Sequence, residues 1–211
     1  MRIELSGTGR RFNQDWIFRR ANLSFTTGEA YALTGPNGSG KSTLLQVIGG
    51  LMQPSEGKVA YHADGKPVAA EDVFRHIALA APYLEVIEEF TVTEFLEFHR
   101  RFKPLRAGIS VPEIIDRIGL GAAAHKQVRH YSSGMKQRVK LAQAFFSDTP
   151  VLLLDEPTSN LDNVGVQLYK DLIAEEAQGR LVIVCSNDPV EYEFCNTVLS
   201  VMDYKPAAQR R

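Results

Sequence analysis

One eight-residue pattern constrains this chain more than any other feature of its sequence. Residues 35–42 read Gly-Pro-Asn-Gly-Ser-Gly-Lys-Ser and match the pattern G-x-x-x-x-G-K-[ST]. Strand-like residues 31–34 precede this loop, and apolar residues follow it at helical spacing from Leu44 to Leu51. Glycines there let the backbone turn its N–H groups inward around an anion, and the new helix adds its positive end. The sequence therefore predicts a phosphate-binding loop at a strand-to-helix corner.

Backbone and side chains of this loop have different expected roles. The Lys41 ammonium can reach the β- and γ-phosphates of a nucleotide, and the Ser42 hydroxyl can bind Mg²⁺. The alternative is a glycine-rich turn with an exposed lysine, which would need neither the preceding strand nor the following helix. The residues expected to contact the nucleotide are Gly35, Pro36, Asn37, Gly38, Ser39, Gly40, Lys41, Ser42 and Thr43.

The composition excludes several other classes of protein. The 211 residues carry 24 basic and 25 acidic side chains, a balance that gives no broad attraction to nucleic acid or anionic lipid. Two cysteines are too few for a disulfide framework and favour a reducing compartment. No stretch has the roughly 18 apolar residues of a membrane span, and the N-terminus lacks the apolar core of a signal peptide. We therefore expect a cytoplasmic protein that contacts a membrane only through a partner chain.

Short apolar strands separated by helices predict an α/β fold. We expect a mostly parallel sheet with an antiparallel β portion, and a helical block near residues 91–149 inserted into the order of the strands. The expected strands are Ile3–Leu5, Leu23–Phe25, Tyr31–Thr34, Lys58–Tyr61 with a return at Pro67–Ala69, Ile77–Ala80, Val151–Leu154 and Leu181–Cys185. The expected helices are Leu44–Leu51, one from Thr91, Pro112–Ile118, Ser133–Phe146 and Val164–Glu176.

The helix expected from Thr91 has a specific start signal. Thr91 and Glu94 fit a capping box, in which each side chain bonds to the backbone N–H of the other residue. The apolar face expected after this box comprises Phe95, Leu96, His99 and Phe102.

Two carboxylates follow a strand that is expected to be fully buried, Val151–Leu154. Because a strand inside a parallel sheet should be apolar throughout, Asp155 and Glu156 at its carboxyl end are expected to face a ligand-binding crevice. We expect Asp155 to hold Mg²⁺ or its waters, and Glu156 to orient and deprotonate an attacking water. An isolated Asp-Glu pair would be better explained as a solvated turn, but the phosphate-binding loop favours the functional interpretation.

A second anion-binding segment is predicted at Tyr131–Arg138, which opens a helix. The Ser132 hydroxyl, the absence of a side chain at Gly134 and the N–H groups of the first helical turn can together bind an anion. On its own, this segment would be better explained as an ordinary N-cap. Its position before the acidic pair favours a functional role.

Together these segments resemble the nucleotide-binding subunit of an ABC (ATP-binding cassette) transporter over nearly the whole chain. The resemblance implies a P-loop NTPase fold of the ABC type in a single domain, 1–211. Its core lobe would comprise residues 1–90 and 150–211, and its helical lobe residues 91–149. The family motifs fall at Gly35–Thr43 (Walker A), Leu152–Glu156 (Walker B), Ser132–Met135 (signature) and Ser159–Asp162 (D-loop).

The resemblance also implies ligands and partners. Phe12 stands where the family places an aromatic ring against adenine, a contact worth about 1–3 kcal/mol, and Trp16 could serve instead. ATP and Mg²⁺ on the Walker A loop of one subunit would be covered by Ser132 and Gly134 of a second nucleotide-binding subunit, identical or different. Hydrolysis would drive a separate transmembrane permease subunit, so that the assembled protein is peripheral on the cytoplasmic face. No nucleic-acid partner is implied.

Three departures from the family pattern concern hydrolysis. Asn187 stands where the family usually has a histidine that touches the γ-phosphate, and an amide can donate a hydrogen bond but cannot carry charge or shuttle a proton. Pro82, to within one residue, stands where the family usually has a glutamine that binds Mg²⁺. Ser133 and Met135 replace the glycine and glutamine of the usual signature. Because losing one transition-state donor slows chemistry about 10²–10³-fold, we predict tight ATP binding with weak or partner-dependent hydrolysis. The catalytic candidates are Glu156, Lys41 and Asn187.

Other interpretations stay open at this point. The chain could be a nucleotide-gated binding module that dimerises on ATP, barely hydrolyses it and relies on an active partner. The segment Leu84–Phe90 mixes apolar and acidic residues, and is either an ordinary loop or a docking face for a short helix of the membrane subunit. A small-molecule kinase is disfavoured, because it would need an acceptor pocket and a lid. These motifs name neither the transported molecule nor the direction of transport.

Overall fold

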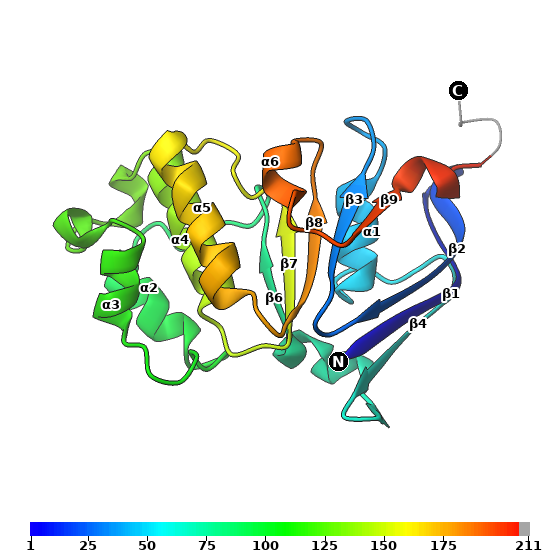
Figure 1. Ribbon diagram of the computed structural model, residues 1–211, viewed down its shortest axis with the longest axis horizontal. Helices are drawn as coiled ribbons and strands as arrows, with labels where there is room; N and C mark the ends of the chain where they lie inside the picture. The colour runs from blue at the N-terminus through cyan, green and yellow to red at the C-terminus, as the bar shows by residue number, and fades with distance from the viewer. Residues whose placement is uncertain (207–211) are drawn as a thin grey trace.

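The chain folds around two β-sheets, and its computed structural model describes residues 1–206. The end of the predicted domain, residues 207–211, lies outside the described residues. The larger sheet is parallel throughout, as expected for strands separated by helices (Figure 1). Its order is β6 (Ile77–Ala80), β7 (Val151–Asp155), β8 (Leu181–Cys185), β3 (Ala30–Thr34) and β9 (Thr197–Ser200). The smaller sheet is antiparallel, with the order β2 (Asp15–Thr26), β1 (Arg2–Phe12), β4 (Glu56–Ala63) and β5 (Lys66–Pro67).

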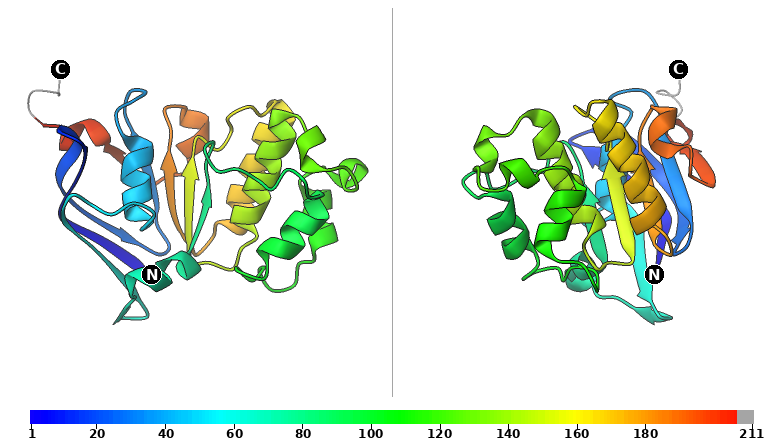
Figure 2. Two further views of the ribbon diagram at one scale, coloured as in Figure 1. Left: turned by 180° about the vertical axis from the view of Figure 1, so that it is seen from behind. Right: turned by 60° about the vertical axis from the view of Figure 1, so that its left-hand side comes forward.

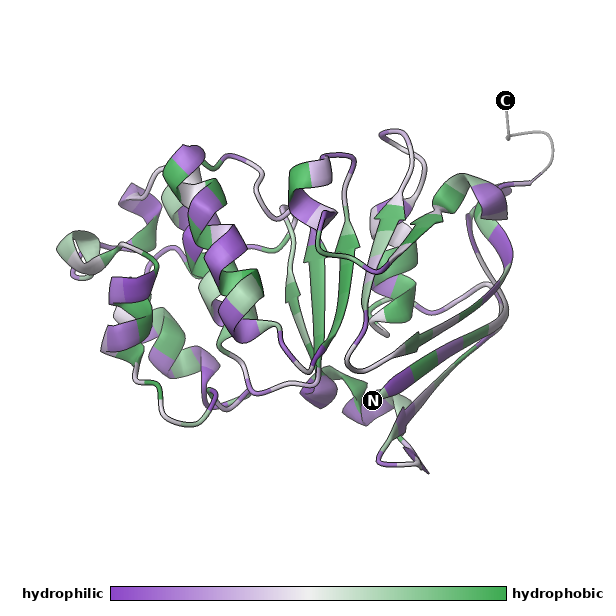
Figure 3. Ribbon diagram, viewed as in Figure 1, coloured by the Kyte–Doolittle hydropathy of each residue, from purple (hydrophilic) through white to green (hydrophobic). Residues whose placement is uncertain are grey.

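The central strands of the parallel sheet are buried on both faces. Side chains alternate along a strand, so Val151 and Leu153 belong to one core cluster while Leu152 and Leu154 belong to the other. The first cluster includes α1 and the antiparallel sheet, and the second includes the helices between β6 and β7. Figure 3 shows the result as apolar strands with polar residues on the outer helix faces.

The strands of the antiparallel sheet are longer than predicted. The sequence indicated only Ile3–Leu5 and Leu23–Phe25, whereas β1 and β2 run for 11 and 12 residues. Their pairing shifts register between Leu5 and Arg11, and such irregularities interrupt the alternation of apolar and polar residues on which the prediction depended.

The helices follow the predicted order with small differences in their limits. They are α1 (Lys41–Ile48), α2 (Val92–His99), α3 (Val111–Arg117), α4 (Ser133–Phe145), α5 (Asn163–Glu176) and the short α6 (Pro189–Tyr192), with 3₁₀ segments at Ala70–His76, Gly121–Ala123, Val128–His130 and Val201–Tyr204. The predicted extension of α1 to Leu51 is wrong, because the helix ends at Ile48 with Gly49 as its C-cap, and Leu51 is 58% exposed.

The predicted start of α2 is confirmed and its predicted length is wrong. Thr91 Oγ1 accepts a hydrogen bond from the Glu94 N–H at 3.2 Å, and the Thr91 N–H donates to the Glu94 carboxylate at 2.8 Å. Phe95 and Leu96 are buried as predicted, but the helix ends at His99 and Phe102 is 62% exposed. The face expected to run through Phe102 therefore stops one turn earlier.

Helices α2, α3 and α4 all lie between β6 and β7 in chain order. They gather at one end of the molecule beside α5, with the antiparallel sheet at the opposite end and the parallel sheet between (Figure 2). Among residues 1–206 we find no helix with the length and apolar character of a membrane span.

Candidate nucleotide-binding site

The carboxyl ends of three parallel strands bring the predicted loop and the acidic pair to one edge. The Glu156 N–H donates to the Cys185 carbonyl at 2.9 Å, and the Ser186 N–H donates to the Leu33 carbonyl at 3.2 Å. These bonds connect the ends of β7, β8 and β3 in turn. The segments that follow the three strands, beginning at Gly35, Glu156 and Ser186, are therefore neighbours. This edge is where parallel α/β sheets bind ligands.

The loop between β3 and α1 has a conformation that requires glycine at its end. Gly40 has φ of 101°, a left-handed value, and caps the N-terminus of α1. A Cβ at this position would lie 2.3 Å from Cγ2 of Ile17, so a side chain would collide with β2. Glycine is therefore required where the loop enters α1, and no side chain caps the first turn of this helix.

Lys41 lies inside the loop rather than in solvent. The residue is 5% exposed, and its Nζ donates to the carbonyl of Gly35 at 2.7 Å and to that of Pro36 at 3.4 Å. Ser39 is also buried, and its Oγ has no hydrogen-bond partner among the described residues. A buried donor without a partner is costly unless a ligand or water satisfies it. The interior of the loop is therefore suited to a negatively charged, hydrogen-bond-accepting group.

Asp155 carries an unsatisfied carboxylate oxygen at the end of β7. The residue is 2% exposed, and its Oδ2 has no hydrogen-bond partner among residues 1–206. Burial, together with the charge of Glu156, raises the pKa of Asp155 to about 6, while the Ser42 hydroxyl and the Lys41 ammonium limit the rise. A buried carboxylate beside a serine hydroxyl fits a divalent cation that prefers oxygen ligands, of which Mg²⁺ is the one this loop pattern implies.

Glu156 has a strained backbone. Its φ of 42° is left-handed, which is unusual for a residue with a side chain. The Ser159 N–H donates to its carbonyl at 3.1 Å, so the chain turns sharply after β7. Strain of this kind is often stored at functional positions. Here the left-handed backbone turns Glu156 out of the direction of strand β7.

Asn187 is hydrogen-bonded to the phosphate-binding loop. Its Oδ1 accepts from the Gly35 N–H at 3.2 Å, and its Nδ2 donates to Oδ1 of Asn37 at 3.2 Å. The amide therefore holds the entry of the loop from the end of β8. The structure thus places Asn187, a catalytic candidate from the sequence, beside the phosphate-binding loop.

One buried carboxylate of this region was not predicted from the sequence. Glu191 is 3% exposed, and its Oε1 accepts hydrogen bonds from the N–H of Thr158 at 2.7 Å and from its hydroxyl at 2.5 Å. It thereby fixes the segment that follows Glu156. Asp188 and Pro189, a capping residue followed by proline, could have indicated the short helix α6 that carries it.

The two aromatic candidates for stacking on a base have different surroundings. Two guanidinium groups lie over the Trp16 ring, that of Arg19 at 4.0 Å and that of Arg11 at 5.5 Å from the ring centre. Phe12 is 44% exposed, and among residues 1–206 only the Arg10 guanidinium, at 4.8 Å, lies over its ring. Trp16 is therefore already in contact with two cations, and Phe12 is the more exposed of the two rings.

Ser132 and Gly134 lie in a different place from the loop. They line a pocket of about 460 Å³ together with residues of the 119–123 and 160–162 segments, and none of the described residues that line it belongs to Gly35–Thr43. Ser132 caps α4, because its Oγ accepts from the Met135 N–H at 3.2 Å. A Cβ at Gly134 would lie 2.9 Å from the Asn160 carbonyl oxygen, so this position has no room for a side chain.

Comparison with known proteins decides what this arrangement represents. The family model described as ABC transporter matches residues 18–159, a range that contains the loop, the Ser132–Gly134 segment and the acidic pair. The chain belongs to the ABC transporter family. It is an ATP-binding subunit of that family, whose members generally hydrolyse ATP.

Individual relatives of this ABC subunit cover most of its length. It is 36% identical over 188 residues to the cytochrome c biogenesis ATP-binding export protein CcmA of Rhizobium johnstonii, covering 85% of each chain. It is 32% identical to ABC transporter I family member 1 of Arabidopsis thaliana, over 91% of this chain and 84% of the relative.

Solved structures agree with the fold. A putative ABC transporter ATP-binding protein from Pyrococcus furiosus gives a TM-score of 0.80 at 21% identity, over 98% of this chain and 100% of that one. A second solved structure is a dimeric ATP-binding cassette in a post-hydrolysis state, bound to ADP and Pi. It gives a TM-score of 0.78 at 26% identity, over 94% of this chain and 93% of that one. The predicted ABC-type P-loop NTPase fold is thereby confirmed.

Proposed function

We propose that this subunit binds ATP with Mg²⁺ on the loop Gly35–Thr43, closes head to tail on a second nucleotide-binding subunit and hydrolyses the nucleotide. The observation that carries the proposal is the separation of two half-sites. The loop, Asp155 and Glu156 share one edge of the parallel sheet, whereas Ser132 and Gly134 line a pocket to which the loop does not contribute. A second subunit brings the two halves together.

The residues of the loop edge have distinct roles in this proposal. Lys41 exchanges its bonds to the Gly35 and Pro36 carbonyls for bonds to the β- and γ-phosphates. Ser42 and the free oxygen of Asp155 hold Mg²⁺, which neutralises the negative charge that develops on the phosphates. Glu156 orients the attacking water and accepts its proton. Phe12 stacks on the adenine.

Ser132 and Gly134 act on the nucleotide of the other subunit. The Ser132 oxygen accepts from the Met135 N–H, so its own proton is free to donate to a phosphate oxygen. Bare backbone at Gly134 and the N-terminus of α4 add further donors. The pair of subunits can be identical or different. In both cases residues 1–211 function as one domain, with the core lobe 1–90 and 150–211 and the helical lobe 91–149.

The mechanical output goes to a transmembrane permease subunit, with this subunit peripheral on the cytoplasmic face. An apolar pocket of about 200 Å³ supports such a contact. Its lining includes Leu51 and Phe74, which are 58% and 49% exposed, and Leu84 from the segment Leu84–Phe90. A short helix of the permease would cover these side chains. In this interpretation the segment is a docking surface rather than an ordinary loop.

A nucleotide-gated module with little hydrolysis of its own is the second candidate, and one observation favours it. Asn187 uses both ends of its amide on the phosphate-binding loop, and it cannot carry charge or move a proton. Such a subunit would still close on ATP, while an active partner supplied the chemistry.

Binding and closure can be tested on the isolated subunit. We expect the Glu156→Gln variant to bind ATP and to accumulate as a dimer in light scattering with excess Mg-ATP, because closure no longer leads to hydrolysis. Lys41→Ala should lose ATP binding by about 100-fold or more, since each lost charge-assisted bond costs about 1.5–3 kcal/mol. Lys58→Ala, at an exposed position of β4, is the control that should bind normally.

Two outcomes would contradict the proposal. Normal ATP binding by Lys41→Ala would remove the basis for the loop site. A Glu156→Gln variant that binds ATP but stays monomeric, alone and mixed with its co-purifying subunit, would contradict the head-to-tail dimer. ATPase activity of the lone subunit, compared with that of the complex purified with its permease, distinguishes the hydrolytic function from the gated module.

A further inference from the structure

The turn that carries Glu156 needs support from its surroundings. Its φ of 42° is costly for a residue with a side chain, and such a backbone persists only where neighbouring groups hold it. Within the turn itself, the Ser159 N–H donates to the Glu156 carbonyl at 3.1 Å. This bond closes the turn but does not fix its direction relative to the rest of the molecule. The groups that fix it lie on the two residues between, Pro157 and Thr158.

Thr158 is held from the side of α6. The Glu191 Oε1 atom accepts from the Thr158 N–H at 2.7 Å and from the Thr158 hydroxyl at 2.5 Å. Glu191 is itself fixed, because its backbone carbonyl accepts from the buried Tyr169 hydroxyl at 2.6 Å. One side of the turn is therefore bound to the core around α5 and α6.

Pro157 is held from the opposite side, by α4. The Gln137 Nε2 atom donates to the Pro157 carbonyl at 2.8 Å. Because proline has no N–H, this carbonyl is the one hydrogen-bonding group that Pro157 possesses. Pro157 is buried, so its carbonyl would be costly to leave without a partner. Gln137 thus satisfies the residue that directly follows Glu156.

The burial of Gln137 is unusual for its residue type. It is 3% exposed, whereas glutamine is mostly exposed in proteins, and ordering its long side chain costs conformational entropy. An apolar residue at this position of α4 would pack without that cost. The bond to Pro157 is therefore the feature that accounts for a buried amide here.

We propose that Gln137 is a positioning residue for Glu156, and that it holds the turn after β7 so that the Glu156 carboxylate meets the attacking water. Gln137 acts only through the Pro157 carbonyl. Without this bond, residue 156 can relax from its left-handed backbone toward a common one, and its carboxylate moves with it. The inference rests on the proposed function, since it requires Glu156 to be the base.

The Gln137→Met variant tests the bond, because methionine has nearly the same length and no hydrogen-bond donor. We measure single-turnover hydrolysis, with the co-purifying complex in excess over radiolabelled ATP, since this experiment measures the chemical step even when it is slow. We expect a rate about 10–100-fold below that of the wild type, because a misplacement of about 1 Å can cost about 10²-fold. The affinity for a non-hydrolysable ATP analogue should stay within about twofold of the wild-type value, because the loop Gly35–Thr43 is unchanged.

Gln137→Glu is the second variant. It has the size of glutamine but turns a carboxylate oxygen toward the Pro157 carbonyl, so we expect a loss of rate at least as large.

Thr149→Val is the matched control, because it also replaces a buried polar side chain by an apolar one of similar size. The Arg180 Nη2 atom donates to Thr149 Oγ1 at 2.7 Å, just before β7 and at the opposite end of that strand from Glu156. This variant should lose stability in urea denaturation, because the guanidinium loses a partner. Its single-turnover rate should nevertheless stay within about twofold of the wild-type value, since the turn at Glu156 is unchanged.

Three results would overturn the inference. One is a wild-type rate in both Gln137 variants, and another is a loss of rate matched by an equal loss of affinity for the analogue. The third is an equal loss of rate in Thr149→Val, which would make the effect one of general stability. If the wild-type complex itself cleaves no ATP, the proposed hydrolysis fails before any variant is compared, which is a distinguishable result.

Discussion

The Oδ1 atom of Asn187 accepts a hydrogen bond from the backbone N–H of Gly35 at 3.2 Å. The end of β8 is thereby joined to the first residue of the phosphate-binding loop. The same amide donates to Asn37, so both of its ends serve the loop. Asn187 thus has a clear structural role, although it departs from the family pattern. Its chemical role is limited, because an amide can form hydrogen bonds but cannot carry charge or move a proton.

A histidine at this position should increase hydrolysis. We expect Asn187→His to raise the steady-state ATPase rate by about tenfold or more, because imidazole can carry charge and move a proton, and one transition-state donor is worth about 10²–10³-fold. The affinity for ATP should change little. Asn187→Gln is the control, since it keeps an amide and should give no gain. If the histidine variant hydrolyses ATP no faster than wild type, the missing histidine does not limit the reaction.

A side chain at Gly134 should loosen the junction between the start of α4 and the 159–162 segment. An alanine Cβ would lie 2.9 Å from the Asn160 carbonyl oxygen. Since that oxygen belongs to the backbone, the two segments would have to move apart to relieve the clash, with a loss of stability. Overpacking of this kind costs about 1–3 kcal/mol, partly offset by about 1 kcal/mol of helix propensity. We expect urea denaturation of Gly134→Ala to give a lower free energy of unfolding, and its ATP-dependent dimer to be lost.

Gly121→Ala is the matched comparison for Gly134→Ala. Its Cβ would also be close to a neighbour, at 2.8 Å, but the neighbour is the end of the flexible Asp116 side chain. This variant should keep its dimerisation and most of its stability. Equal behaviour of the two variants would show that the contact with Asn160 is unimportant.

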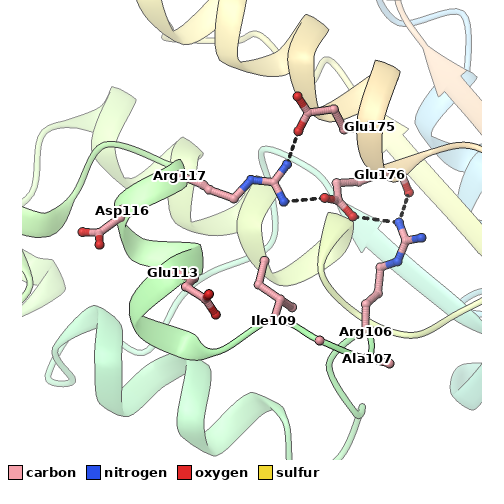
Figure 4. Close-up of a pocket in the computed structure, with 9 residues that line it drawn as sticks. Arg106, Ala107, Ile109, Glu113, Asp116, Arg117, Glu175 and Glu176 are labelled. Atoms are coloured by element: carbon pink, nitrogen blue, oxygen red, sulfur yellow. Dashed lines mark hydrogen bonds and ion pairs between the residues drawn. The ribbon is translucent and has the colours of Figure 1, made fainter.

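A wide pocket away from the site is lined by ion pairs. It measures about 660 Å³ and is lined by the 106–109 loop, α3 and the end of α5 (Figure 4). Arg106 Nη1 lies 2.8 Å from Glu176 Oε2, and Arg117 pairs with both Glu175 and Glu176. The Glu176 side chain is only 13% exposed, so it is the centre of this cluster.

Removing the Glu176 charge should destabilise the fold without touching the nucleotide site. Glu176→Gln leaves two arginines with weaker partners, and we expect a loss of about 1–3 kcal/mol in the free energy of unfolding. Glu193→Gln, in the exposed pair with Lys170, should cost less than about 0.5 kcal/mol. Denaturation of both variants measures the difference, and equal effects would rule out a central role for Glu176. ATP affinity should be unchanged in both.

The parts of the fold predicted well are those with a local signal. Strands β7 and β8 were predicted because a buried parallel strand is an uninterrupted apolar run. The start of α2 was predicted because the capping box of Thr91 and Glu94 joins residues only three positions apart. Strand β9 was not predicted, since a short edge strand with exposed residues has neither an apolar run nor alternation. The full lengths of β1 and β2 were not predicted, because register shifts interrupt the alternation of apolar and polar residues along them.

The candidate site also has parts that the sequence predicted and parts that it did not. The loop Gly35–Thr43 and the acidic pair are contiguous in sequence, so a motif could predict them. The contacts of Glu191 with Thr158 and of Asn187 with Gly35 join residues more than 30 positions apart, and no spacing in the sequence indicates them. Their existence follows from the parallel sheet, which brings the ends of distant strands together.

His99 is a neutral imidazole at the end of α2. Its Nε2 lies 2.9 Å from Ser147 Oγ, and that hydroxyl donates its own proton to the Gln143 carbonyl at 2.5 Å. The Ser147 oxygen must therefore accept from the histidine, which assigns the proton to Nε2. Burial, and next the charge of Lys103, lowers the pKa of His99 to about 4.

This histidine should make the fold less stable in mild acid. A folded-state pKa near 4 lies below the unfolded value of about 6.5, so the unfolded chain binds more protons between these limits and the stability falls as the pH decreases through that window. From pH 7 to pH 4.5 this one group should cost about 2 kcal/mol, at 1.36 kcal/mol per pKa unit. His99→Gln retains a donor for Ser147 but does not titrate, so its stability should fall by about 2 kcal/mol less over the same range. Urea denaturation at both pH values measures the difference, and parallel losses in the two proteins would mean that His99 is already charged in the folded state.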